Sequence, residues 1–169
     1  MTIHQILYLP DERLRKIAKP VEVFDDALQT LIDDMFETMY DARGVGLAAP
    51  QIGISLRLSV IDVVGDKKNQ LVIINPEIIA SEGLVDYDEG CLSVPGAYDK
   101  VKRAQKVTIR ALDRHGKSFE MSAEGILGEC FQHEIDHLNG KLFIDLLSPL
   151  KRAEARLKLN KYKRNKTRK

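Results

Sequence analysis

The sequence predicts an α+β fold, in which small antiparallel or mixed sheets pack around a central helix and a basic helix ends the chain. The order of the patterns indicates this class: a helical pattern comes first, several short strand-like runs follow, and a second helical pattern comes after them. The composition, 44% hydrophobic and 30% charged, is that of an ordinary globular protein. With 169 residues, a single domain is expected.

The first third of the chain predicts one long helix. A short helical turn is expected over residues 10–15, and residues 24–40 form a helix whose first turn is acidic, which suits the positive end of the helix dipole. The apolar side of that helix has the spacing of a buried stripe. Its members are Leu28, Leu31, Ile32, Met35, Phe36 and Met39. A glycine-rich loop follows over residues 44–53.

The middle of the chain predicts strands. Short runs rich in β-branched residues are separated by turn residues, as in antiparallel sheets. The expected strands cover residues 56–64, 71–75, 78–81, 84–87, 106–112 and 117–122. The sequence Asp-Arg-His-Gly at 113–116 predicts the turn of a hairpin.

Residues 124–138 predict the central helix. Their apolar residues recur at helical spacing, Ser122 is a candidate N-cap, and the pair Asn139-Gly140 predicts the end. The helix contains His-Glu-Ile-Asp-His at 133–137.

This motif predicts a metal site. A spacing of four places His133 and His137 on one helical face, where both imidazoles can hold one ion, and Glu134 lies beside them to transfer a proton. The alternative interpretation is a helix whose histidines merely pack in a core. A catalytic site keeps three protein ligands and an open position, so a third ligand is needed.

The third ligand is expected upstream of the helix. One group of metallopeptidases uses a histidine at the position held here by Phe143, and Glu154 lies among basic residues. Cys130 lies seven residues before His137, about 10 Å along a helix, so it is better read as a small apolar residue. Cys91, in a loop between strands, can approach the helix from outside, although an ordinary buried thiol remains the alternative.

Charge is divided unevenly along the chain. Residues 151–169 hold ten lysines and arginines and one glutamate, a net charge of +9, whereas residues 1–150 carry −8. This contrast predicts a separate partner for the tail. Residues 148–169 predict a basic helix, with Leu150, Ala153 and Leu157 along one side. No apolar run is long enough to span a membrane, no signal peptide is recognised, and two cysteines favour a reducing compartment, so a cytoplasmic location is expected.

Three segments together resemble peptide deformylase. They are GVGLAAPQ at 44–51, EGCLS at 89–93 and QHEIDH at 132–137, and the likeness covers residues 4–150. The sequence as a whole resembles the Gram-negative bacterial type of this family, which has a helical C-terminal extension. The resemblance implies a catalytic domain over residues 1–150 and a basic helical extension, not a separate domain, over residues 151–169.

The resemblance also implies a reaction and its groups. The reaction would remove the formyl group from N-formylmethionine of nascent polypeptides and release formate. Cys91, His133 and His137 would bind one Fe²⁺, for which Ni²⁺ or Zn²⁺ could substitute. Glu134 would act as general acid and base, and Gln51 and the backbone N–H of Leu92 would donate hydrogen bonds to the formyl oxygen.

The resemblance further implies how the peptide is held. Val45, Gly46 and Gly90 would pair with its backbone as with an added strand, and Ile126 and Cys130 would line an apolar slot for methionine. Two positions depart from the form expected in that family. Tyr98 stands where arginine is frequent, and Glu129 where an apolar residue is frequent.

Two other function classes share part of this pattern. A metallopeptidase would cleave internal peptide bonds, but its usual downstream third ligand is absent. A ribosome-associated protein with a structural metal would need a fourth ligand, and none is well placed. For the basic tail itself, ribosomal RNA is the expected partner, against the alternative of a solvated surface helix.

Overall fold

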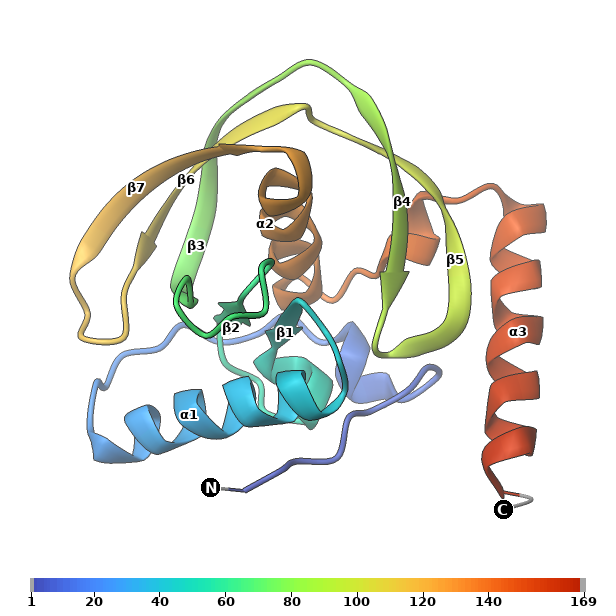
Figure 1. The fold of residues 1–169 in the computed structure, drawn as a ribbon, viewed down its shortest axis with the longest axis horizontal. Helices are drawn as coiled ribbons and strands as arrows, with labels where there is room; N and C mark the ends of the chain where they lie inside the picture. The colour runs from blue at the N-terminus through green and yellow to red at the C-terminus, as the bar shows by residue number, and fades with distance from the viewer. Residues whose placement is uncertain (1, 168–169) are drawn as a thin grey trace.

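Three α-helices and seven strands make up the structure, a computed structural model that describes residues 2–167 (Figure 1). The helices are α1 (Asp26–Asp41), α2 (Gly125–Leu138) and α3 (Pro149–Thr167). The strands are β1 (Gly46–Ala48), β2 (Leu58–Ile61), β3 (Leu71–Glu82), β4 (Val85–Cys91), β5 (Val94–Arg103), β6 (Lys106–Leu112) and β7 (Ser118–Glu124). Short 3₁₀ turns are η1 (Glu12–Arg15), η2 (Ala49–Ile52) and η3 (Phe143–Leu146).

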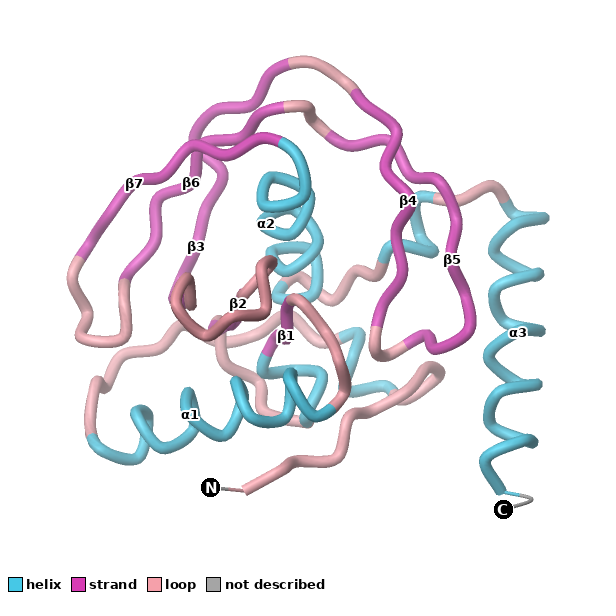
Figure 2. Tube along the Cα trace, viewed as in Figure 1, coloured by secondary structure: helices cyan, strands magenta, loops and turns pink. Residues whose placement is uncertain are grey.

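Two antiparallel sheets enclose the central helix, which confirms the predicted α+β class. The larger sheet has the order β1-β2-β3-β6-β7, and the smaller one consists of β4 and β5. Helix α2 lies between them (Figure 1). The chain passes from β3 into β4 and from β5 into β6 as two adjacent arches over α2 (Figure 2). Each sheet therefore supplies one wall around the helix that carries the histidines.

Several strand boundaries differ from the prediction. Strand β2 is shorter than the expected 56–64, and β4 extends beyond the expected 84–87 to Cys91, which therefore ends a strand and does not lie in a loop. The expected strands 71–75 and 78–81 are one strand, β3, which has irregular pairing with β6 near Asn75 and Pro76. The prediction missed β5, because its sequence VPGAYDKVKR contains proline, glycine and alternating charges instead of an apolar run. It also missed β1, which lies within the glycine-rich loop.

Helix α1 packs as its apolar stripe predicts. Asp25 caps its N-terminus by accepting a hydrogen bond from the Leu28 backbone N–H at 3.0 Å. The buried stripe belongs to a core cluster shared with β1, β2 and β3. Its buried members are Leu28, Ile32, Met35, Phe36 and Met39.

The limits of helix α2 come from the strand before it and the turn after it. Ser122 is not the cap: it lies in β7, with its Oγ 2.6 Å from Thr108 Oγ1, and Glu124 precedes the helix without a side-chain cap. The predicted end is confirmed, because Asn139 terminates α2 and Gly140 has a φ of +76°. A side chain at Gly140 would collide with the Arg15 backbone.

Helix α3 packs along the outer side of β5, and it buries a different face from the predicted one (Figure 1). Ala155 and Leu159 enter the core, whereas the expected stripe of Leu150, Ala153 and Leu157 faces outward. Leu150 and Leu157 are 71% and 68% exposed. The prediction assumed that the side with Leu150 and Leu157 is buried, but the contact with β5 buries the opposite side of the helix. Residues 168 and 169 of the predicted helix lie outside the described residues.

The two ends of the described chain meet beside the same wall. In the extended segment before η1, the Leu7 N–H donates to Gln51 O at 2.7 Å and the Leu9 N–H to Ser93 O at 3.1 Å. From α3, Lys163 Nζ donates to the Leu9 carbonyl. This segment is therefore fixed between the centre of the molecule and its last helix.

Candidate metal centre and catalytic cleft

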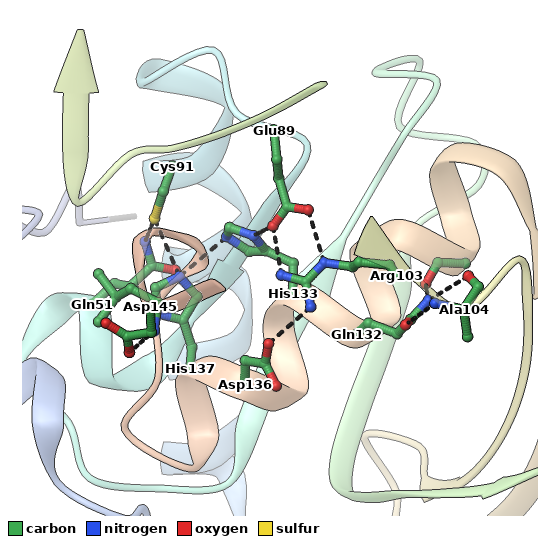
Figure 3. Close-up of polar contacts among 12 residues, drawn as sticks. Gln51, Glu89, Cys91, Arg103, Ala104, Gln132, His133, Asp136, His137 and Asp145 are labelled. Carbon is green, nitrogen blue, oxygen red and sulfur yellow. Dashed lines mark hydrogen bonds and ion pairs between the residues drawn. The ribbon is translucent and has the colours of Figure 1, made fainter. Parts of the chain in front are cut away.

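Three side chains from two elements converge at the centre of the molecule. Cys91 Sγ lies 3.2 Å from His137 Nε2, which lies 3.1 Å from His133 Nε2 (Figure 3). All three ligand atoms lie within 4.8 Å of one another. Helix α2 supplies both imidazoles, and the end of β4 supplies the thiol. A thiolate and two imidazoles form a donor set suited to one Zn²⁺ or Fe²⁺ ion, so the residues present fit a metal.

A buried ionic network holds His133 in this position. Glu89 accepts a hydrogen bond from His133 Nδ1, which leaves Nε2 directed at the other ligands (Figure 3). Arg103 donates to both Glu89 oxygens, at 2.6 and 2.8 Å, and to Asp136 Oδ2 at 2.8 Å. Burial alone would raise the pKa of Glu89, but Arg103 and His133 outweigh it and keep the pKa below its usual range.

Glutamine 132 attaches the same helix to the backbone between β5 and β6. Its Oε1 accepts from the Ala104 N–H at 2.9 Å, and its Nε2 donates to the Ala104 carbonyl at 3.0 Å (Figure 3). These two bonds fix α2 along its axis, so the histidines are positioned relative to both sheets.

Glu134 lies next to His133, beside the candidate metal ligands, where little of its surface is exposed. Its side chain is nearly fully buried, and burial raises its pKa to about 7. Within the part of the chain that the structure describes, its Oε1 has no hydrogen-bond partner. A Cβ atom at Gly46 would fall 2.5 Å from Glu134 Oε2, so glycine is required for the loop to approach this carboxyl group.

The Gln51 side chain is fixed with its amide nitrogen toward the cysteine. Its Oε1 accepts from the Ala48 N–H at 2.9 Å. Its Nε2 donates to Ser93 Oγ at 3.0 Å and lies 3.7 Å from Cys91 Sγ. The buried amide therefore presents a donor to the metal centre without rotational freedom.

A cleft of about 740 Å³ opens onto these groups. It is lined by the five residues predicted to hold the peptide backbone and the methionine side chain: Val45, Gly46, Gly90, Ile126 and Cys130. Gln51, predicted to contact the formyl oxygen, is buried and is not among the lining residues. Leu92 and Glu134 line it as well. Burial raises the pKa of Cys130, so its thiol stays protonated and behaves as a small apolar group, as expected from its place on the helix.

The two atypical positions also line the cleft. Tyr98 is paired with Gly90 in the β4–β5 ladder, and its ring covers the space that a side chain at Gly90 would need. Glu129 lies between Ile126 and Cys130 along the cleft, and burial raises its pKa to about 7. These residues give this cleft a more polar rim than the apolar slot expected from the family resemblance.

Sequence reasoning missed the groups that position the ligands. Glu89 lies in the segment EGCLS and Asp136 in the segment QHEIDH, and the sequence assigned neither of them a role. Arg103 carried no signal of its own, because its partners lie 14 and 33 residues away along the chain. A buried arginine can be recognised only when the tertiary structure is known.

Two histidines on a helix, a cysteine from a facing strand and a buried glutamate at the base of a cleft define a metal-dependent hydrolase. Residues 3–153 match the family model for polypeptide deformylase, and the chain belongs to that family. It is accordingly an enzyme that removes the N-formyl group from formylmethionyl peptides in protein biosynthesis.

Relatives of known name agree with this assignment. The peptide deformylase of Azotobacter vinelandii is 59% identical over 165 residues, which cover 97% of this chain and 98% of the relative. The crystal structure of a peptide deformylase from Legionella pneumophila is 73% identical, covers 99% of both chains and has a TM-score of 0.98. A Synechococcus elongatus peptide deformylase in complex with actinonin is 45% identical, covers 90% of this chain and 85% of its own, and has a TM-score of 0.87. Among the helices of residues 2–167, none is long and apolar enough to cross a membrane.

Proposed function

We propose that Cys91, His133 and His137 hold one Fe²⁺, with Ni²⁺ or Zn²⁺ as substitutes, and that formyl peptides are hydrolysed beside it. The observation that carries this proposal is the convergence of one sulfur and two imidazole nitrogens within 4.8 Å at the base of the cleft. A bound ion supplies Lewis-acid polarisation and makes water acidic enough to lose a proton near neutral pH.

Different residues around this position transfer the proton and stabilise the negative charge. A Glu134 oxygen takes the proton of the attacking water, and it delivers that proton to the amide nitrogen when the C–N bond breaks. The products are formate and a free amine. Gln51 Nε2 and the Leu92 N–H donate to the formyl oxygen, on which negative charge develops. The rigid hydrogen bonding of Gln51 supports its role, because a fixed donor needs no reorganisation during the reaction.

The substrate backbone is proposed to bind between two sheet edges. Strand β1 is an edge of the larger sheet, and β4 is an edge of the two-stranded sheet. Gly46 begins β1 and Val45 directly precedes it, Gly90 lies on β4, and all three residues line the cleft. A peptide added between such edges is held by main-chain hydrogen bonds, which suits substrates of many sequences.

The methionine side chain is proposed to occupy the apolar part of the cleft. Val45 and Ile126 are 40% and 55% exposed at its rim, and Cys130 lies buried beneath them. Covering Val45 and Ile126 with a thioether chain would remove apolar surface from water on both sides of the contact.

Formate release from formyl-Met-Ala-Ser tests the assignment of roles. The protein is purified without oxygen and loaded with Fe²⁺ or Ni²⁺, because an iron–thiolate site is open to oxidation. Glu134→Gln should retain one metal per chain and lose activity by a factor of about a thousand. Cys91→Ala should lose metal as well as activity, whereas the matched control Cys130→Ala should keep the metal. Full activity of Glu134→Gln would contradict the role of that carboxyl group.

We further propose that residues 1–150 act as the catalytic domain in the cytoplasm and that the extension over residues 151–169 associates with ribosomal RNA. The exposed basic side chains of α3, Arg156 and Lys158 among them, would attract phosphates without reading a sequence. Truncation is a poor test, since Ala155 and Leu159 belong to the core.

Charge substitution is the sharper test of this association. Arg156→Gln with Lys158→Gln should reduce co-sedimentation with ribosomes at low salt and reduce its dependence on salt. The double variant Leu150→Ala with Leu157→Ala, on the exposed apolar side, serves as the control. Unchanged sedimentation of the charge variant would refute a role for these two residues.

A further inference from the structure

We propose that the end of α3 completes a distal subsite for the substrate residues that follow the second one. The inference rests on the proposed peptide orientation in the cleft. The subsite consists of Tyr8 from the N-terminal segment and of Tyr162 and Lys166 from α3. In this view α3 takes part in peptide recognition directly, apart from any association with the ribosome.

The cleft itself extends from the metal centre to this helix. The residues that line it include His133 and Glu134 at one end and Tyr8, Tyr162 and Lys166 at the other. An adjoining cavity of about 210 Å³ also includes Tyr8 and Lys166 in its lining. The two cavities share five residues: Ile6, Tyr8, Asp41, Ala42 and Lys166. A continuous groove therefore leads away from the catalytic groups, as an extended peptide of several residues would require.

The N-terminal segment presents alternate side chains to this groove. Leu7 and Leu9 direct their N–H groups to the backbone of Gln51 and Ser93. Ile6, which precedes Leu7, and Tyr8, which lies between the two leucines, line the cleft. Extended backbone places successive side chains on opposite sides, so the hydrogen bonds of this segment determine that Tyr8 faces the groove.

Aromatic and cationic groups are packed together at the end of the groove. The Tyr8 and Tyr162 rings meet edge to face, with centroids 6.0 Å apart and planes at 88°. Lys166 Nζ lies 5.2 Å from the centroid of the Tyr8 ring and 3.1 Å from Tyr8 Oη. Ring surfaces bind apolar side chains, and an ammonium group donates to peptide carbonyls, so this cluster suits a peptide with an apolar third residue.

Helix α3 is held close to the wall that carries the metal-ligating cysteine. Gly96, in the strand after Cys91, has a φ of +83°, and a Cβ atom there would lie 3.6 Å from the Lys158 carbonyl. Lys163 also donates to the Leu9 carbonyl. The position of Tyr162 is therefore linked to the cleft wall by the close approach of α3 to Gly96 and by the Lys163 side chain, and the subsite exists before substrate arrives.

The test compares two formyl peptides of different length, formyl-Met-Ala and formyl-Met-Ala-Leu-Leu. Wild type should have the higher kcat/KM on the longer one. Tyr162→Ala combined with Lys166→Ala should lower kcat/KM for the longer peptide about fivefold, and for the shorter one less than about twofold. Lys161→Ala, which removes an exposed lysine that does not line the groove, is the matched control and should alter neither value.

The outcomes separate the subsite from the reaction. Equal losses on both peptides, or no loss on either, would overturn the subsite, and so would a wild type without preference for length. Tyr162→Phe, which keeps the ring, should retain the preference; its loss in this variant would overturn recognition by aromatic packing. Absence of formate from the shorter peptide would instead contradict the proposed reaction, and thermal melting of each variant verifies its fold.

Discussion

Charged residues serve opposite purposes in two regions of this molecule. Around α2, Glu89 and Arg103 are buried and His133 is partly buried, and direct hydrogen bonds join them (Figure 3). Along α3, the basic residues are mostly exposed, and ion pairs such as Lys151 with Asp99 lie at the surface. In the first region, each charge depends on its partner. In the second, each charge contributes to a field that acts on distant molecules.

The difference shows what a single substitution measures in each place. Removing one member of the buried network leaves another charge in a dry position, which is costly, whereas removing an exposed charge returns its partner to water. The effects of mutation should therefore differ greatly between the two regions, although the residue types are the same.

The largest effect is expected from Arg103. Arg103→Leu leaves Glu89 without its main partner at a side-chain exposure of 2%, so unfolding free energy should fall by about 3–5 kcal/mol. Lys102→Leu, one residue away, removes only an exposed contact with Asp86 at 3.7 Å. It should change the unfolding free energy by less than about 1 kcal/mol. Urea denaturation of both variants measures this. Similar losses would show that burial does not distinguish the two charges.

A smaller effect is expected when the hydrogen bond between Glu89 and His133 is weakened. Glu89→Gln keeps the size of the side chain but removes the charge that orients His133, so metal affinity should fall about 10- to 100-fold. Competition with a chelator measures the affinity. Asp86→Asn, on the same strand and exposed, is the control. An unchanged affinity would mean that packing alone orients the imidazole.

Asp62 is a buried carboxylate that forms no ion pair with any residue of the described range 2–167, and it can be compared with the buried network. Burial would raise the pKa of Asp62, but hydrogen bonds from Tyr40 Oη and from the Gly65 and Lys67 amides outweigh it and hold the pKa below its usual range. Because the folded-state pKa is lowered, this stabilisation is present above about pH 4 and is lost as pH falls through the folded pKa.

Asp62→Asn should therefore lower the unfolding free energy by about 1–3 kcal/mol at pH 7, and by less at pH 3. Denaturation at the two pH values measures the difference between wild type and variant. Asp66→Asn, on the same turn but exposed, should show no such dependence. A difference that stays constant between pH 3 and pH 7 would contradict the role assigned to the charge.

The smallest effect belongs to α3. Lys151 Nζ lies 3.1 Å from Asp99 Oδ1, and both side chains are partly exposed. A double-mutant cycle with Lys151→Ala and Asp99→Ala should give a coupling of about 0.5 kcal/mol, decreasing in high salt. A coupling several times larger would show that this pair anchors the helix, and would remove the contrast between the two regions.

Local signals predicted much of the fold and two of the three proposed metal ligands. The stripe of α1 and the end of α2 at Asn139 follow from spacing and turn chemistry, and His133 and His137 follow from helical geometry. The buried face of α3 did not follow, because Leu150 and Ala155 are equally suited to a helix and only β5 decides between them. Arg103 was missed for the same reason, since its burial depends on partners distant in sequence.

The contact between Tyr8 and Lys166 affects when this part of the molecule can form during synthesis. Tyr8 and Lys166 are 158 residues apart in the chain, yet their side chains are in contact. Contacts at such sequence separation form only after the intervening chain is available. The part of the cleft wall that Tyr8 and Lys166 form is thus completed only after the residues between them have left the ribosome.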